Sequence, residues 1–332
     1  MNMKEFETKV EKALKDYEGG QSDVRISQVR KNNGILLTGV SLFREQSNIT
    51  PTVYLDDYLK RYDEGESFGS VMNEIIRLLE ESGEEKHFDV SSFLEWKRAR
   101  NRIAYRLVNA EKNSELLKEL PHILYLDMAI VFYYLLGEGD FGNASILIYN
   151  RHMEQWGVTR EQLYAEAQEN SRKLLPENLQ SMKELMRDIL LEDIRRKMKE
   201  IPGTEKESGE CLDLLAQEML ESVMEGREDI PMYVLTSKAK YYGAACMLYP
   251  GVLHSFAAGL GKSLYILPSS IHEVILLGDT GMETAEQLRE MVRQVNETQV
   301  AADEVLSDSV YYYDLRKEEL LRIREEEAAV SA

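Results

Sequence analysis

The chain has 332 residues, of which 43% are hydrophobic and 30% are charged, a composition typical of an ordinary globular protein. Its 59 acidic and 40 basic side chains give a formal net charge of −19, which opposes non-specific binding to nucleic acid or anionic lipid and would suit a basic partner. Two cysteines, Cys211 and Cys246, are too few for a disulfide scaffold, so we expect two reduced thiols in a cytoplasmic protein.

The sequence gives no signal for a membrane. Residues 1–11 are highly charged and lack the apolar core of a secretory signal. The most apolar run, residues 123–136, is interrupted by Asp127 and is shorter than the roughly 20 residues that a bilayer span needs. We therefore expect no membrane association.

The first part of the chain is predicted to hold three helices and one β-hairpin. The helices are expected over residues 1–18, 50–65 and 69–81, and the hairpin strands over 24–30 and 35–43. Asn32, Asn33 and Gly34 predict the hairpin turn because these residue types tolerate positive φ. Thr50 and Pro51 predict the start of the second helix, since threonine caps helices and proline suits their first position.

The middle of the chain combines predicted strands with two longer helices. The strands are expected over residues 102–108, 123–136 and 145–149, and the helices over 159–174 and from 176 onward. Thr159, with Gln162 three residues later, makes a capping box, which is the clearest helix start in the chain. Pro176 is expected to open the second of these helices.

The C-terminal part follows a linker predicted over residues 201–210, which are rich in Gly, Pro, Ser, Thr and charge. After the linker we expect helices over 211–224, 251–260 and from 281, and strands over 232–235, 244–249, 310–314 and twice within 264–279. Thr280 and Glu283 are expected to cap the last helix. The acidic end, 318–332, lacks a turn signal and is predicted to fray.

These elements predict an α+β protein with two lobes, in which mixed or antiparallel sheets pack against helices. Frequent hairpins argue against a regular βαβ alternation. The predicted organisation is an N-terminal α+β lobe over 1–200 with a sub-boundary near residue 86, a linker over 201–210, a C-terminal α+β lobe over 211–317 and a frayed acidic tail over 318–332.

Residues 264–279 are the most informative stretch, because they place polar groups among apolar ones. Four side chains there invite a hydrolase interpretation, with a serine as nucleophile and the histidine as base: Ser269, Ser270, His272 and Glu273. Such a triad would need an acid from elsewhere in the fold, and the chain has no Gly-x-Ser-x-Gly elbow. We favour the alternative, a structural hydrogen-bond network, because buried polar groups are usually satisfied in this way.

Asp127 is a further candidate, because it interrupts an apolar run. A carboxylate between Leu126 and Met128 can be desolvated with a raised pKa, as in an active-site acid. It can also lie at a bend between two strands, which is the interpretation that we favour because aspartate prefers turns.

No cofactor and no metal are expected. The histidines do not fall into any local zinc motif, and no Gly-rich phosphate loop is present. A metal site assembled across the fold stays open for two pairs, His122 with Asp127 and His272 with Glu273.

One basic patch interleaves aromatic and basic residues, a pattern that can stack bases and bind phosphates. Its basic members are Lys97, Arg98, Arg100, Arg102 and Arg106. In so acidic a chain we favour a solvated helix face that pairs with acidic neighbours. Nucleic-acid contact through this patch is therefore a secondary hypothesis.

Several motifs resemble a family of proteins from Gram-positive gut bacteria that is grouped as a domain of unknown function. The matching motifs are Lys31-Asn32-Asn33-Gly34, Pro51-Thr52-Val53-Tyr54-Leu55, Met232-Tyr233-Val234-Leu235-Thr236, Gly243-Ala244-Ala245, Leu248-Tyr249-Pro250 and Leu267-Pro268-Ser269-Ser270-Ile271-His272-Glu273-Val274. Residues 153–176 are similar, more faintly, to a second uncharacterised bacterial family. The resemblance implies a single bacterial cytoplasmic architecture and brings no established activity, cofactor or catalytic residue. Members of the first family are often encoded near mobile elements.

Three functional hypotheses follow from the sequence. The leading one is a non-catalytic binding or regulatory protein with an unknown macromolecular partner, which the acidic charge would suit to a basic surface. The second is a hydrolase with a cleft near His272. The third is nucleic-acid contact through the basic patch.

Overall fold

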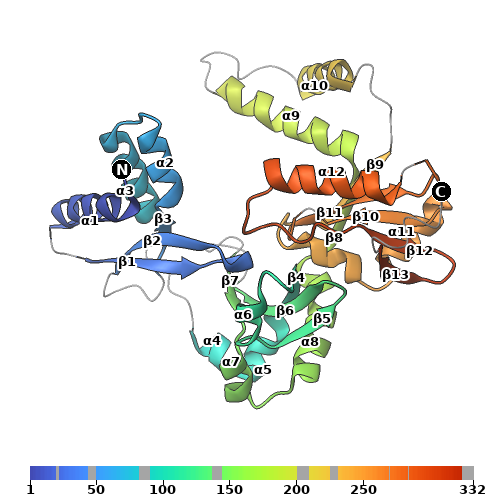
Figure 1. Cartoon of the computed structure of the whole chain (residues 1–332), viewed down its shortest axis with the longest axis horizontal. Coiled ribbons are helices and arrows are strands. Elements are labelled where there is room, and N and C mark those ends of the chain that lie inside the picture. Colours follow the sequence, from blue (N-terminus) through green and yellow to red (C-terminus); the bar gives the residue numbers. More distant parts are fainter. Residues whose placement is uncertain are drawn as a thin grey trace.

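The computed structural model describes residues 1–19, 22–43, 50–81, 90–136, 144–199, 209–224, 231–268, 270–282 and 284–323. In these residues the chain folds into helices and three antiparallel sheets, which confirms the predicted α+β class (Figure 1). None of the helices in these ranges combines the length and the apolar character that crossing a bilayer requires.

The N-terminal part folds around a core of its own, at the left of Figure 1. Its elements are α1 (Met3–Glu18), β1 (Asp23–Arg30), η1 (Asn32–Gly34), β2 (Leu36–Phe43), β3 (Thr52–Tyr54), α2 (Asp56–Asp63) and α3 (Phe68–Glu81). The predicted hairpin is confirmed: β1 pairs with β2 over its full length, and Asn33 has a φ of 59° in the turn. The core gathers side chains from all three helices and all three strands, among them Phe6, Val40, Val53 and Ile75.

The predicted start of the second helix at Thr50 is wrong. Residues Thr52–Tyr54 pair with β2 as an edge strand, and α2 begins only at Asp56. The β-branched Thr52 and Val53 suit a pleated surface, and Val53 is buried against the helices.

The middle part is built on a second sheet, with β6 at its centre. Its elements are α4 (Val90–Leu94), α5 (Trp96–Ala99), η2 (Arg100–Arg102), β4 (Ile103–Asn109), α6 (Ser114–Leu117), β5 (His122–Tyr125), β6 (Met128–Leu135), β7 (Ser145–Leu147), α7 (Asn150–Trp156) and α8 (Arg160–Leu174). β4 pairs with one edge of β6, while β5 and β7 pair with successive halves of β6. The predicted capping box is confirmed at α8, where the Thr159 side chain accepts from the Gln162 amide.

The C-terminal part forms a six-stranded sheet in the order β13-β12-β10-β11-β9-β8. Its elements are β8 (Glu177–Ser181), α9 (Met182–Lys199), α10 (Gly209–Met224), β9 (Met232–Ser237), η3 (Gly243–Leu248), α11 (Val252–Leu260), β10 (Leu264–Leu267), β11 (Glu273–Gly278), α12 (Ala285–Thr298), β12 (Tyr311–Asp314) and β13 (Glu319–Arg322). One strand of this sheet, β8, therefore precedes residue 200, and five follow it. Residues 201–208 of the predicted linker and the predicted sub-boundary near residue 86 lie outside the described residues.

Three predictions for this part are wrong in ways that long-range packing explains. Pro176 precedes the strand β8 instead of opening a helix, because β8 pairs with β9. Residues 244–248 belong to the 3-10 helix η3, whose small side chains are buried against β9 and β11, and Tyr249 follows it with an extended backbone. Residues Glu319–Arg322 pair with β12 instead of fraying, whereas residues 324–332 lie outside the described residues.

The cap of α12 also differs from the prediction. Thr284 caps the helix and forms a capping box with Gln287, whereas Thr280 lies before it and Glu283 is outside the described residues. A capping box satisfies two backbone amides at once, which a single cap does not.

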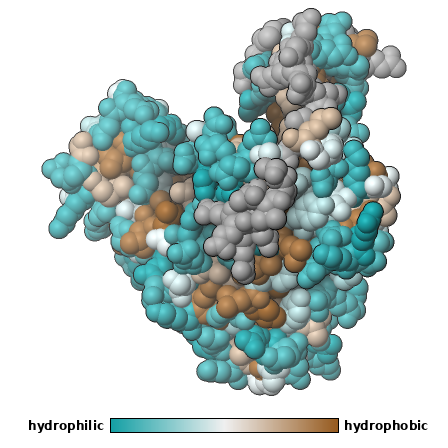
Figure 2. Space-filling view, turned by 45° about the vertical axis from the view of Figure 1, so that its right-hand side comes forward, coloured by the Kyte–Doolittle hydropathy of each residue, from teal (hydrophilic) through white to brown (hydrophobic). Residues whose placement is uncertain are grey.

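The main core gathers side chains from the second sheet, the six-stranded sheet, α8, η3 and α11. Leu276 of β11 and Phe132 of β6 both belong to it. The opposite face of the six-stranded sheet packs against α12 through Leu277, Leu288 and Val292. Helices α9 and α10 pair with each other at the β8 end of the six-stranded sheet, where α9 contacts β8 and β9 (Figure 1). The surface is mostly hydrophilic, with a few apolar patches on the face shown in Figure 2.

Candidate functional site

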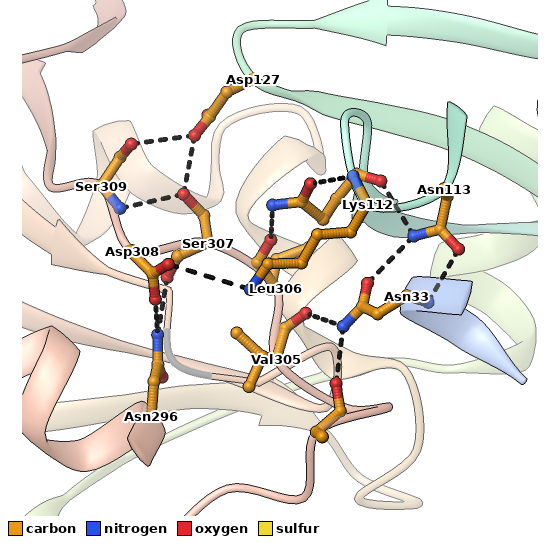
Figure 3. Close-up of polar contacts among 12 residues, drawn as sticks. Asn33, Lys112, Asn113, Asp127, Asn296, Val305, Leu306, Ser307, Asp308 and Ser309 are labelled. Carbon is orange, nitrogen blue, oxygen red and sulfur yellow. Dashed lines mark hydrogen bonds and ion pairs between the residues drawn. The ribbon is translucent and has the colours of Figure 1, made fainter. Parts of the chain in front are cut away.

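The three parts of the chain meet at the loop between α12 and β12, residues 299–310. Asn33, at the tip of the N-terminal hairpin, donates from Nδ2 to the carbonyl oxygens of Ala302 (2.9 Å) and Val305 (2.7 Å). Its Oδ1 accepts from Nδ2 of Asn113 (3.0 Å), and its backbone amide donates to Oδ1 of Asn113 (2.9 Å) (Figure 3). One asparagine thus joins the hairpin to both other parts.

Replacing Asn33 with glycine is expected to loosen this junction. Glycine keeps the left-handed backbone but removes three side-chain hydrogen bonds, so we expect a loss of about 1–3 kcal/mol in unfolding free energy. Asn33→Asp should cost more, because a carboxylate would face the carbonyl oxygens of Ala302 and Val305. Urea denaturation of both variants measures this. Equal stability of Asn33→Asp and wild type would contradict the role of the asparagine amide.

Asp127 lies in the two-residue turn between β5 and β6 and reaches the same loop. Its carboxylate accepts hydrogen bonds from three hydroxyls: Ser307 (2.7 Å), Ser309 (2.8 Å) and Tyr311 (2.6 Å). Burial raises the pKa of this carboxyl, but the three hydroxyl bonds, with Arg322 nearby, outweigh burial and lower it overall. Asp127 is therefore held as a carboxylate that fastens the second sheet to the loop (Figure 3).

Next to this junction lies a cavity of about 390 Å³, called here the His272 cleft. One face of the second sheet forms one wall, with Arg106, Tyr133, Ser145 and Leu147. The other walls come from the hairpin tip (Arg30, Lys31, Asn32), the turn after β9 (Tyr241, Tyr242), the segment before β11 (Ile271, His272) and the α12–β12 loop (Asp303, Glu304). Leu116 and Tyr149 complete the lining. The cleft is thus assembled from segments that are far apart in the sequence.

His272 is held on both sides of its ring. Nδ1 accepts from the backbone amide of Tyr242 (3.2 Å), and Nε2 lies 3.5 Å from Oε1 of Glu304. The ring also stacks on that of Tyr242, with centroids 5.7 Å apart and planes 9° from parallel. Because Nδ1 is an acceptor, the proton of the neutral ring lies on Nε2 and faces the carboxylate.

Ser270 and Glu273 do not complete a catalytic arrangement with this ring. The Ser270 hydroxyl accepts from the backbone amide of His272 (3.0 Å), and no hydroxyl of the described residues hydrogen-bonds to the imidazole. Ser269 lies outside the described residues. Glu273 begins β11 and does not line the cleft; burial is the main cause that raises the pKa of its carboxyl.

Arg106 and Tyr133 are diagonal neighbours on one face of the second sheet, because Arg106 pairs with Val131 and Tyr133 with Ala104. The Arg106 guanidinium lies 4.4 Å from the centre of the Tyr242 ring. In the described part of the chain, neither Nε of Arg106 nor the hydroxyl of Tyr133 has a hydrogen-bond partner, although both atoms are buried. Buried polar groups normally have partners, and the cleft lining holds three atoms that do not: these two donors and the acceptor Oδ1 of Asn32.

Several members of the predicted basic patch pair with protein groups. Arg100 pairs with Glu166 (2.6 Å), Arg98 with Glu95 (3.3 Å), and Arg102 donates to the carbonyl of Leu136 (2.7 Å). Lys97 lies with Arg98 on the short helix α5, and of the five only Arg106 lines the His272 cleft.

Several cleft residues gave no signal in the sequence. Tyr133 lies within an apolar strand, and Glu304 follows a helix 32 positions from the histidine that it faces. Tyr241 and Tyr242 stand before Gly243, and Tyr242 has a left-handed backbone with a φ of 51°. A bulky residue in that conformation is an outlier that often marks a functional segment, but only coordinates show it.

Metal binding gains no support from the geometry. Among the residues described, no cluster of three or more His, Cys, Asp or Glu side chains could hold a metal ion. His122 bonds through Nδ1 to the carbonyl of Leu120 (2.9 Å), while Asp127 is occupied by hydroxyls. Cys246 is a free, buried thiol, and burial raises its pKa to about 12, so it stays protonated.

The fold and the cleft define an α+β protein whose open donors lie where three sheets meet. Residues 3–315 match the family of unknown function DUF5688, and the chain belongs to that family. This match confirms the resemblance to an uncharacterised domain-of-unknown-function family. No curated protein and no solved structure matches the chain.

Proposed function

We propose that the protein is a non-catalytic binding protein and that the His272 cleft is its binding site. One observation carries this proposal: the cleft wall holds two buried donors without partners, on Arg106 and Tyr133, while both ring nitrogens of His272 face protein groups. Open donors favour a ligand that supplies acceptors. A histidine with both nitrogens engaged is poorly placed to act as a base on a bound substrate.

The partner that we propose is a macromolecule that inserts a side chain or a chain end into the cleft. A cavity of about 390 Å³ is large enough for one such group. The net charge of −19 favours a partner whose surrounding surface is basic, because opposite charges steer association.

Filling the cleft is expected to abolish this binding. Ser145 lines the cleft from β7, and Ser145→Trp would place an indole in the cavity. Glu154→Trp, on the exposed surface of α7, adds the same side chain away from it. We expect immobilised wild type and Glu154→Trp to retain a common partner from native lysate at low salt and to release it at high salt, whereas Ser145→Trp retains none.

Two outcomes would contradict the proposal. A partner held equally by Ser145→Trp and wild type would place the binding surface elsewhere. Failure of wild type to retain any macromolecule at low salt would count against a charge-steered partner.

The hydrolase alternative has one observation in its favour, the His272–Glu304 pair in a concave site. It also requires a nucleophilic hydroxyl on the imidazole, and Ser270 bonds to backbone instead. The binding proposal is therefore the better supported of the two.

A further inference from the structure

We propose that the His272 cleft binds an oxyanion, a carboxylate or a phosphate, between Arg106 and Tyr133. This inference rests on the proposed function and names the chemical class of the group that enters the cleft. It does not follow from the overall charge of the protein, which is strongly negative.

The two open atoms on the sheet wall of the cleft are both donors, and the lining has a third open atom, the acceptor Oδ1 of Asn32, at the hairpin tip. Nε of Arg106 carries a proton under all ordinary conditions. The Tyr133 side chain is 1% exposed, and burial raises its pKa well above the ordinary value, so its hydroxyl also keeps a proton. Two buried donors on one wall require acceptors from the ligand, and the oxygens of an anion are the strongest acceptors available.

The two donors also lie on neighbouring strands of one sheet face. Arg106 and Tyr133 project from adjacent strands on the same face of the sheet, two residues out of direct register. Tyr242 holds the guanidinium from one side, and His272 in turn stacks on Tyr242. The positions of both donors are thus fixed before a ligand arrives, which lowers the entropy cost of binding.

The local charge of the cleft also favours an anion. The cleft is lined by three cationic side chains, Arg30, Lys31 and Arg106, and by two acidic ones, Asp303 and Glu304. Counted without His272, these side chains carry one positive charge in excess, and Glu304 already faces His272. A singly charged anion would balance this excess, whereas a cation placed beside Arg106 would be repelled.

The experiment is calorimetric titration of the whole chain with four probes: inorganic phosphate, phenyl phosphate, benzoate and the charge-reversed benzylammonium. We expect an anionic probe to bind and benzylammonium not to bind. Tighter binding of benzoate would assign a carboxylate, and tighter binding of phenyl phosphate or inorganic phosphate would assign a phosphorylated group.

Two variants test the named donors. Tyr133→Phe should weaken anion binding about tenfold, and Arg106→Gln about a hundredfold, as expected for lost hydrogen bonds to a charged group. Tyr133→Phe removes a hydroxyl that has no partner, so its thermal stability should equal or exceed that of wild type. Tyr105→Phe, a buried tyrosine on β4 outside the cleft, and Arg100→Gln, an exposed arginine, should bind as wild type does.

The outcomes separate this inference from the binding function itself. Anion affinity unchanged in both Tyr133→Phe and Arg106→Gln would overturn the oxyanion site. If no anion binds but Ser145→Trp prevents binding of a macromolecular partner, the cleft is still a binding site and only the assignment of an oxyanion ligand is overturned. If no anion binds and no partner depends on Ser145, both proposals fall.

Discussion

Gly243→Ala is expected to destabilise the protein by about 3 kcal/mol or more, because overpacking against rigid atoms is among the costliest substitutions. A Cβ at this position would lie 2.2 Å from the backbone nitrogen of Ser237, 2.4 Å from Oγ1 of Thr236 and 2.6 Å from the carbonyl oxygen of His272. Two of these three atoms are backbone, so neither can swing aside.

The matched control is Gly259→Ala in α11. No atom lies within 4 Å of the Cβ that would be added at Gly259. Alanine in an open helical position should stabilise the protein by about 0.5–1 kcal/mol. Urea denaturation of the two variants should therefore give changes of opposite sign. A stable Gly243→Ala variant would mean that η3 can move away from β9 and β11. Tyr242, which lines the His272 cleft just before η3, would then move as well.

Asp127→Ala has the second largest expected effect, a loss of about 3 kcal/mol in unfolding free energy, because it leaves three hydroxyls without their acceptor. These are the hydroxyls of Ser307, Ser309 and Tyr311, all of them buried residues. Asp23→Ala is the control: it removes a carboxylate whose pairing with Arg25 is well exposed to solvent, and such pairs contribute less than about 1 kcal/mol.

The pH dependence of this effect has a definite sign. The pKa of Asp127 is lower in the folded protein than its ordinary value of 3.8. Its stabilising contribution is therefore complete above about pH 4 and is lost as the pH falls through the folded pKa. The stability difference between wild type and Asp127→Ala should be constant from about pH 5 to 8 and should shrink below about pH 4. A difference that grew in acid would show that the group binds its proton more tightly when folded.

Local chemistry made part of this fold predictable. Asn33 and Gly34 predicted the hairpin turn because few residue types accept a left-handed backbone. Thr159 and Gln162 predicted the start of α8 because their side chains satisfy backbone amides only a few residues away. Each of these interactions joins residues only a few positions apart, so the sequence alone is enough to predict it.

The errors lie where distant residues decide the local structure. Residues Thr52–Tyr54 form a strand because they pair with the free edge of β2. Residues Glu319–Arg322 form a strand because they pair with the free edge of β12. Residues Gly243–Leu248 form a 3-10 helix that packs so closely on β9 and β11 that a Cβ at Gly243 would clash with Ser237 and His272. Periodicity over a short window cannot report such neighbours.

The same contrast applies to the candidate site. His272 stood out in the sequence as a polar residue beside apolar ones, and the structure places it in a cleft. In the sequence, Arg106 stands out only as a member of a charged run. Tyr133 gives no signal, because a tyrosine in an apolar strand is an ordinary core residue. Their open donors become visible only when the strands are paired.

The loop that joins the three parts also constrains when the site can exist during synthesis. The ribosome releases the N-terminal hairpin and the second sheet before the α12–β12 loop, and domains generally fold in the order of their synthesis. The carbonyls that Asn33 binds lie 269 and 272 residues after it in the sequence, and Glu304, opposite His272, belongs to the same late segment. A nascent chain that stops short of this segment can fold its hairpin and its second sheet and still lack one wall of the cleft.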